Sequence, residues 1–171
     1  MDVMTSQRQL IVMRHAKAGE LPGGPDAERA LRPRGRRNAA AAGAWLASRD
    51  LVPDRVLCST ARRARQTWQY VSAELAGKPE LVSDERLYDA SGRDLLDIFA
   101  QTDPDVRSLM YVGHNPAAAD VVELLTGTPV PFPTAAMAVI SLGGGWDDLY
   151  GGSANGTAEL AASWVPRADA G

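Results

Sequence analysis

Segments typical of strands alternate with segments typical of helices along most of this chain, and this alternation restricts the fold more than any other feature. Short apolar runs with the length of buried strands lie at residues 10–13, 55–58, 80–82 and 108–112. Strands that alternate with helices form a mostly parallel sheet with helices on both faces. The sequence therefore predicts a three-layer α/β/α sandwich around a mostly parallel central sheet.

The segments between these strands carry helical patterns, expected at residues 35–49, 92–101 and 116–125 and in a fourth helix that follows the strand at 55–58. In this fourth helix, apolar residues three or four positions apart predict one face packed on the core, and they are Ala61, Ala64, Trp68, Val71 and Leu75. We expect Gly77 to end this helix.

The last part of the chain has a different pattern. Residues 134–142 predict a strand, and residues 143–165 predict glycine-rich turns around short strands. The Gly, Ser and Asn residues at 151–156 are interpreted as a hairpin loop, not as a domain boundary. With 171 residues, of which 45% are hydrophobic, the chain is expected to form a single domain over residues 1–171.

The charge balance excludes some classes of partner. The chain has 18 basic and 21 acidic residues and a formal net charge of -3, so nucleic acid is not an expected partner. Cys58 is the one cysteine and cannot form an internal disulfide, and no secretory signal or membrane-spanning run is recognisable. The expected location is the cytoplasm, without a membrane partner. No metal or other cofactor is expected, because the histidines and the cysteine lack the usual ligand spacing.

Three of the predicted strands end in polar residues, within the segments "IVMRH", "VLCSTARR" and "LMYVGHN". The carboxyl ends of parallel strands lie at one edge of a sheet, where open α/β folds bind their ligands. Arg14, His15, Arg63 and His114 are therefore predicted to meet in one pocket. Arg62 and Arg65 cannot reach the same ligand as Arg63, because successive helical residues turn by about 100°.

Two of these strand ends also begin helices. Ser59 or Thr60 is the expected N-cap of one helix, and Asn115 that of another, with Pro116 in its first position. The free N–H groups of helix starts favour a bound phosphate, and arginine binds phosphate oxygens with two parallel hydrogen bonds. A neutral imidazole can attack phosphorus and form a phosphoramidate that water later hydrolyses. The predicted chemistry is phosphoryl transfer without a metal.

The same residues resemble the signatures of the histidine phosphatase superfamily, which has the phosphoglycerate mutase-like fold. The segment "RHA" is similar to its Arg-His-Gly signature, with Ala16 in place of glycine, and "STARRARQT" and "VGHNP" are similar to its second and third motifs. The segments "ERALRPRGRRNA" and "AELAASWVP" and the small size resemble the SixA-like branch, named for phosphohistidine phosphatases.

The resemblance implies roles for individual residues. His15 would be the phosphorylated nucleophile, Arg14 and Arg63 would hold the phosphoryl group, and His114 would donate a hydrogen bond to it. Asn115 belongs to the predicted substrate-binding residues. Members with a general acid carry it near the middle of the chain, where Asp89 is the first candidate and Glu85 the second. A phosphohistidine donor needs less protonation than an alkyl phosphate ester.

Several alternatives stay open from the sequence. The substrate is a phosphohistidine protein or a small phosphomonoester such as a nucleoside monophosphate or a sugar phosphate. A binding module that recognises a phosphorylated partner without turnover and a mutase are further possibilities. Clustered arginines at positions 32, 34, 36 and 37 are interpreted as a solvated helix start, although such a cluster also suits nucleic acid or a phosphoprotein. The oligomeric state is left open.

Overall fold

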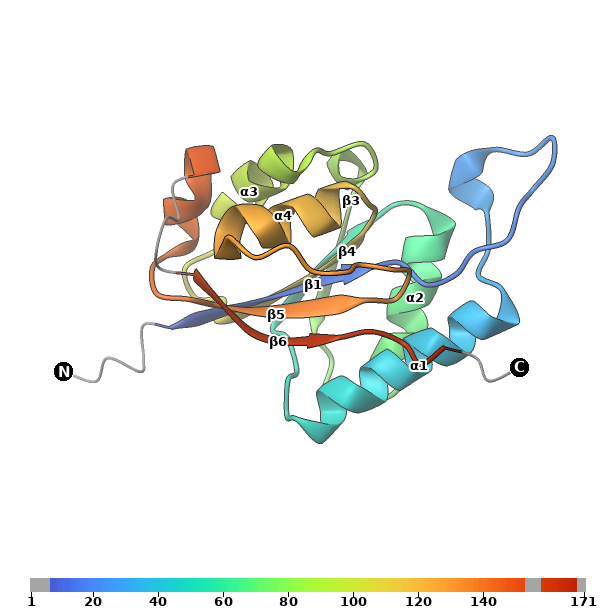
Figure 1. Cartoon of the computed structure of the whole chain (residues 1–171), viewed down its shortest axis with the longest axis horizontal. Coiled ribbons are helices and arrows are strands. Elements are labelled where there is room, and N and C mark those ends of the chain that lie inside the picture. The colour runs from blue at the N-terminus through green and yellow to red at the C-terminus, as the bar shows by residue number, and fades with distance from the viewer. Residues whose placement is uncertain (1–6, 153–157, 169–171) are drawn as a thin grey trace.

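A computed structural model describes residues 7–152 and 158–168 of the chain. Its centre is a six-stranded sheet with the strand order β3-β2-β4-β1-β5-β6 (Figure 1). The strands are β1 (Arg8–Arg14), β2 (Arg55–Ser59), β3 (Glu80–Asp84), β4 (Ser108–Gly113), β5 (Met137–Leu142) and β6 (Ala158–Trp164).

The first four strands along the chain are parallel to one another, as the alternating pattern predicts. β1 pairs in parallel with β4, β4 with β2, and β2 with β3. On the other side of β1 the sheet changes, because β5 pairs with β1 in the antiparallel direction and β6 does the same with β5. The sheet is thus mostly parallel, with the last two strands added to one side.

Helices cover both faces of this sheet and make the three predicted layers (Figure 1). One face carries α1 (Pro33–Ser48) and α2 (Arg62–Ser72), and the other carries α3 (Gly92–Ala100) and α4 (Ala117–Thr126). Short 3-10 turns lie at η2 (Asp26–Glu28), η3 (Glu85–Leu87) and η4 (Trp146–Gly152). No helix in the described part of the chain has both the length and the apolar character needed to cross a membrane.

The alternation of side chains along β1 divides the core into two halves. Leu10 and Val12 point to the half beneath α3 and α4, while Ile11 and Met13 point to the half beneath α1 and α2. All four side chains are fully buried. A strand that is apolar on both sides fits only a sheet covered on both faces, which explains the unbroken apolar run that precedes Arg14.

The helix boundaries depart from the sequence-based expectation at several places. α1 begins at Pro33, two residues before the expected start, because proline is well tolerated in the first turn of a helix. α2 ends at Ser72, so Gly77 does not end it, although Leu75 beyond the helix is still buried. Of the expected hairpin loop at 151–156, residues 151 and 152 belong to η4, and 153–156 lie outside the described residues.

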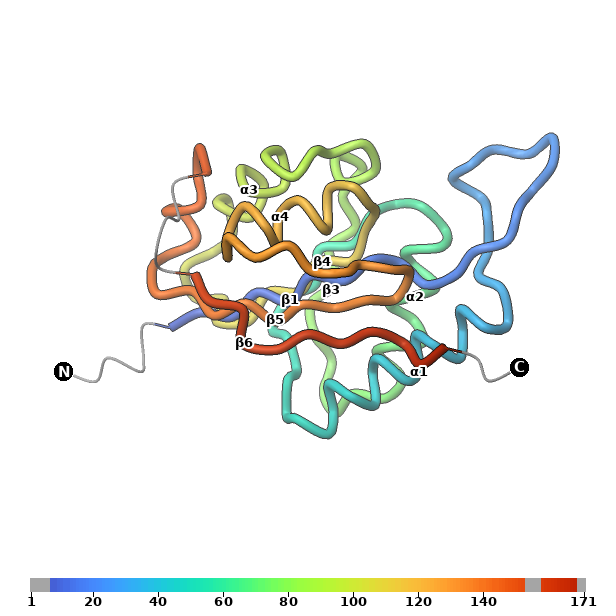
Figure 2. The backbone as a smooth tube through the Cα atoms, in the orientation of Figure 1, coloured from blue at the N-terminus to red at the C-terminus, as the bar shows by residue number. Residues whose placement is uncertain are grey.

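The register of the parallel strands brings their carboxyl ends together. Arg14 at the end of β1 pairs with Gly113 at the end of β4, and Val112 of β4 pairs with Cys58 near the end of β2. The chain then leaves this edge through the long loop after β1, which returns to start α1 (Figure 2). Residues that are far apart in sequence therefore share one end of the sheet.

Candidate active site

A polar cavity of about 340 Å³ lies at this edge of the sheet. Its walls contain the predicted residues Arg14, His15, Arg63, Asp89, His114 and Asn115, together with Lys17, Ala18, Asp26, Arg29, Tyr88 and Thr134. Glu85, the second candidate for a general acid, is not in the wall of this cavity and lines a neighbouring hollow on the surface. The four residues predicted to meet in one pocket therefore do so.

His15 is held by the backbone at the end of β1 and is only 9% exposed. Its backbone N–H donates to the carbonyl of Gly113 over 2.8 Å, and its ring Nδ1 lies 2.8 Å from the carbonyl oxygen of Ala16. A carbonyl oxygen only accepts, so Nδ1 carries the proton and Nε2 keeps its lone pair. The following residue is fixed as well, because Ala16 N–H donates to the hydroxyl of Thr67 on α2.

The His15 ring is neutral at physiological pH. Burial lowers its pKa to about 3, and the positive surroundings of the cavity act in the same direction. The hydrogen bond to the Ala16 carbonyl opposes this shift without reversing it. A neutral ring with a fixed tautomer has a free lone pair on Nε2, which is the state that a nucleophile requires.

His114 follows β4 and faces His15, with 5.3 Å between the two ring centroids. Its Nε2 lies 2.8 Å from Oγ of Ser59 at the end of β2. Ser59 Oγ also accepts from the backbone N–H of Ala61, and a hydroxyl can both donate and accept, so the tautomer of the His114 ring decides which of the two groups donates. Burial, followed by the charge of Arg63, lowers the pKa of His114 to about 4.

The approach of β4 to the cavity depends on Gly113. A Cβ at this position would lie 2.0 Å from the hydroxyl oxygen of Tyr111, so only glycine fits. The same hydroxyl accepts the backbone N–H of His114 over 3.1 Å. Within the "YVGH" segment, the Tyr111 side chain thus passes Gly113 and holds the backbone of His114. The sequence analysis did not predict this contact.

Two guanidinium groups enter the cavity. Arg14 donates from Nη1 to the carbonyl of Phe132, and Arg63 is only 7% exposed. Within the described residues, the Nε–H groups of both arginines are buried and have no hydrogen-bond acceptor. Buried donors without acceptors are costly, and an oxyanion bound between the two arginines would supply acceptors. Arg62 and Arg65 are exposed, as the helical spacing predicts.

Asp26 and Tyr88 complete the wall on the side of Arg63, and the sequence analysis missed both. Arg63 donates to Asp26 twice, from Nη1 to its carbonyl over 2.9 Å and from Nη2 to its carboxylate over 3.0 Å. The Tyr88 hydroxyl and Arg29 Nη1 donate to the same carboxylate. Asp26 lies in a Gly/Pro-rich loop whose composition predicts a turn and gives no sign of a contact with a distant helix.

These contacts fix the charge of Asp26. The hydrogen bond from Tyr88, followed by that from Arg29, holds the pKa of the Asp26 carboxyl far below its usual range. Asp26 is therefore a permanent carboxylate and cannot donate a proton. Asp89 in the same wall is exposed and makes no hydrogen bond within the described part of the chain.

The two helix starts at this edge differ in detail from the expected caps. α2 begins at Arg62 with Ala61 as its N-cap, so neither Ser59 nor Thr60 caps it, and Ser59 is used by His114 instead. α4 begins at Ala117 with Pro116 in the N-cap position. Asn115 still serves this helix, because its Oδ1 accepts from Ala119 N–H while its Nδ2 donates to the carbonyl of Phe132. At the start of α4, the N–H groups of Ala118 and Ala119 therefore already have acceptors within the chain, namely the carbonyl of His114 and Oδ1 of Asn115.

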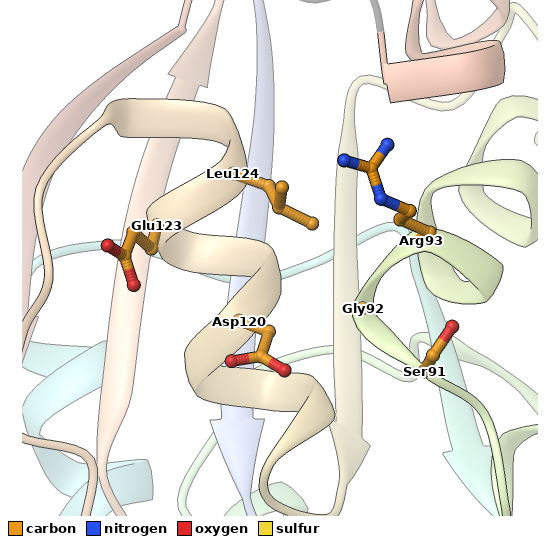
Figure 3. Close-up of a pocket in the computed structure, with 6 residues that line it drawn as sticks. All are labelled: Ser91, Gly92, Arg93, Asp120, Glu123 and Leu124. Carbon is orange, nitrogen blue, oxygen red and sulfur yellow. The ribbon is translucent and has the colours of Figure 1, made fainter.

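A larger hollow of about 430 Å³ lies between α3 and α4, away from these residues (Figure 3). Its walls consist of Ser91, Gly92, Arg93, Asp120, Glu123 and Leu124. The two helices come close here because Gly92 has no Cβ, which would lie 2.9 Å from the Cβ of Asp120. None of the residues predicted to carry chemistry lines this hollow. The described residues also contain no group of three or more His, Cys, Asp or Glu side chains placed to hold a metal ion.

Comparisons with known proteins agree with this geometry. The model of the histidine phosphatase superfamily (branch 1) matches residues 10–105. An uncharacterised protein of Mycobacterium tuberculosis is 36% identical over 166 residues, which cover 91% of this chain and all of that protein. A proposed phosphohistidine phosphatase SixA from Nakamurella multipartitia superposes with a TM-score of 0.79 at 32% identity, covering 95% of this chain and 98% of that one.

A further solved structure is the protein histidine phosphatase SixA in complex with tungstate. It superposes with a TM-score of 0.70 at 28% identity, covering 80% of this chain and 92% of that one. The fold is thus the phosphoglycerate mutase-like fold that the motifs imply. The matched segment contains the strand that ends in Arg14 and His15 and the helix that carries Arg63. On this evidence, the chain belongs to the histidine phosphatase superfamily.

Proposed function

We propose that the protein is a metal-independent phosphatase that transfers a phosphoryl group first to His15 and then to water. The observation that carries this proposal is the state of His15, whose Nδ1 is tied to the Ala16 carbonyl and whose neutral ring leaves Nε2 free in a cavity with two arginines. Family membership and the SixA-like neighbours support a phosphatase.

In the first step, His15 Nε2 forms a bond to phosphorus while the bond from phosphorus to the donor breaks. Arg14 and Arg63 stabilise the charge on the equatorial phosphoryl oxygens. His114 donates from Nδ1 to one of these oxygens, since Ser59 occupies its Nε2. In the second step, water attacks phosphorus, the bond to Nε2 breaks and inorganic phosphate leaves.

The donor that we propose is a phosphohistidine on a protein. The cavity wall is made almost entirely of polar and charged side chains, with Ala18 as its one aliphatic residue. Sites for small molecules are lined mainly by apolar and aromatic side chains, which hold the part of the ligand beyond its charged group. Such a wall suits a phosphoryl group and offers little apolar surface for the base of a nucleotide.

Protonation of the leaving group is assigned to Asp89. Asp26 is excluded from this role by its lowered pKa, and Asp89 is the other carboxyl group in the wall of the cavity. An alkyl phosphate needs this proton more than phosphohistidine does.

The test is the capture of a phosphoenzyme. Brief incubation with phosphoramidate should give an acid-labile phosphoryl adduct on the protein, visible by mass spectrometry at neutral pH. The variant His15→Ala should form no adduct, and Arg63→Ala should lose most of the turnover of p-nitrophenyl phosphate. Arg65→Ala, on the exposed side of the same helix, is the matched control and should retain it. Full turnover by His15→Ala contradicts the proposal, and ligand binding without any turnover by the parent protein indicates a binding module.

A further inference from the structure

The charges of this chain are strongly segregated. Residues 14–37 and 59–67 contain ten of the 18 basic residues and only three of the 21 acidic residues. The remaining chain carries eight basic and 18 acidic residues. The net charge of -3 is therefore the sum of a cationic region and an anionic region, each with a local charge of larger magnitude than the total.

This cationic region reaches the active-site cavity, because Lys17 and Arg29 belong to the cavity wall. Arg32 N–H donates to the carbonyl of Lys17, two residues after His15, and Leu31 N–H donates to the side chain of Gln66 on α2. These bonds join the loop after β1, the start of α1 and the first turns of α2 into one surface (Figure 1). We call this surface the basic rim, and its exposed members are Lys17, Arg32, Arg34, Arg37, Arg62 and Arg65.

The basic rim is continuous with the cavity. Lys17 belongs both to the rim and to the cavity wall that contains His15. Arg65 of the rim donates to the carbonyl of Thr60, and Arg36 beside it donates to the carbonyl of Leu31, whereas Arg29 and Arg63 in the cavity wall pair with the Asp26 carboxylate. Carbonyl partners orient a guanidinium group and leave its positive charge in place.

From this placement we propose that the basic rim is the docking surface for an acidic protein that presents its phosphohistidine to His15. The inference rests on the proposed function and adds the surface that recognises the donor protein. The wall of the cavity offers little apolar surface, so recognition of a protein donor beyond its phosphoryl group falls to the surface around the mouth. Complementary charge around a site speeds encounter and fixes the orientation of the partner.

An acidic protein fits this surface better than a nucleic acid does. A nucleic acid is a long polyanion that extends beyond one patch, and the 18 acidic residues of the remaining chain would repel it. A folded protein with a local acidic patch matches a local basic rim and avoids that repulsion.

The experiment uses two synthetic peptides of equal length, each with one phosphohistidine, flanked by Asp and Glu residues in one and by Lys residues in the other. For the parent protein, we expect kcat/KM to be roughly tenfold higher for the acidic peptide at low ionic strength. The preference should shrink as NaCl is raised to about 0.5 M, because salt screens exposed charges.

Charge reversal tests the location of the effect. The triple variant Arg32→Glu, Arg37→Glu and Arg62→Glu should lose the preference for the acidic peptide while it hydrolyses phosphoramidate at the parent rate. The matched control reverses Arg49, Lys78 and Arg107 to Glu, three exposed residues next to the amino ends of the strands. Both triple variants change the net charge equally, so only a local effect separates them.

Each outcome decides the proposal. Equal rates for the two peptides, or equal losses in both triple variants, overturn the docking surface while phosphoenzyme formation on His15 stays intact. If the parent protein has no turnover, the proposed function fails, and anisotropy of labelled peptides on the full-length chain still measures the docking preference. Single-stranded DNA and poly-L-glutamate are compared as competitors of the acidic peptide. If DNA competes more strongly with the parent protein but not with the rim variant, the surface binds nucleic acid, and the proposal of a protein partner is wrong.

Discussion

The ends of β1 and β4 each deliver a histidine to the same cavity, but they hold it in different ways. His15 is tied through Nδ1 to a backbone carbonyl of the next residue, and its second nitrogen is free. His114 is tied through Nε2 to the hydroxyl of Ser59, which belongs to a third strand. A carbonyl leaves no choice of tautomer, whereas a hydroxyl can donate or accept. The first arrangement suits a nucleophile, and the second suits a hydrogen-bond donor that follows changing charge.

The charged groups around the two rings also differ. Burial comes first among the causes that lower the pKa of each ring. Asp26 and Asp89 oppose the shift at His114, whereas no acidic side chain contributes at His15. The charges around His15 thus all oppose protonation of its ring, whereas the two carboxylates partly offset this effect at His114. Both rings are neutral at physiological pH, so their hydrogen bonds, and not their charge, separate the two roles.

The largest expected effect is the contrast between the two histidine deletions. His15→Ala removes the attacking atom and should lower kcat for p-nitrophenyl phosphate by about 10⁴-fold or more, as removal of a nucleophile does elsewhere. His114→Ala removes one donor to the phosphoryl oxygens and should cost about 10²- to 10³-fold.

The phosphoenzyme separates these variants further. His114→Ala should still form the adduct on His15, more slowly, whereas His15→Ala should form none. Rapid-quench measurement of protein-bound phosphate checks both. An adduct that survives in His15→Ala, or one that is absent from His114→Ala at long times, would contradict the assignment of roles.

Sequence reasoning predicted one part of this site well and another part not at all. Arg14, His15 and His114 end or follow parallel strands, and strand ends meet by the geometry of the sheet alone. Arg63 was found through its place in the first turn of the next helix. Such positions follow from local pattern and topology, which the sequence contains directly.

Asp26 and Ser59 show what the sequence could not supply. Asp26 reaches Arg63 across 37 positions from a loop without periodicity, so no pattern reports the contact. Ser59 looked like a helix cap because it precedes a helix, but the chain uses Ala61 in that position and leaves the hydroxyl to His114. Side-chain choice between a local and a distant partner depends on the packed structure.

An intermediate effect is expected from the carboxylates on the His114 side. Asp89→Asn should lower kcat for an alkyl phosphate by about 10²-fold, the usual contribution of a general acid, because the alkoxide must leave without a proton. Turnover of phosphoramidate should change much less. Glu85→Gln is the matched control, since Glu85 lies outside the cavity wall and should leave both substrates unaffected.

Steady-state rates with the two substrates check this assignment. If Asp89→Asn lowers both rates equally, Asp89 acts through the charge of the cavity and not as a proton donor. If Glu85→Gln instead slows the alkyl ester alone, the second candidate of the sequence analysis takes the role.

The smallest expected effect is a change in the pKa of His114 alone. It tests the difference between the charged surroundings of His114 and those of His15. A negative charge favours the protonated imidazolium, so neutralising Asp26 in Asp26→Asn should lower the pKa of His114 further below about 4. His15 should keep its pKa, because Asp26 is not among its determinants. The chain contains two histidines, so an untagged, ring-labelled sample gives one titration curve for each in NMR spectra. Asp105→Asn, exposed near the amino end of β4, is the control and should move neither curve. Equal shifts of both rings, or a rise at His114, would mean that Asp26 acts by reshaping the cavity around Arg63 and not by its charge.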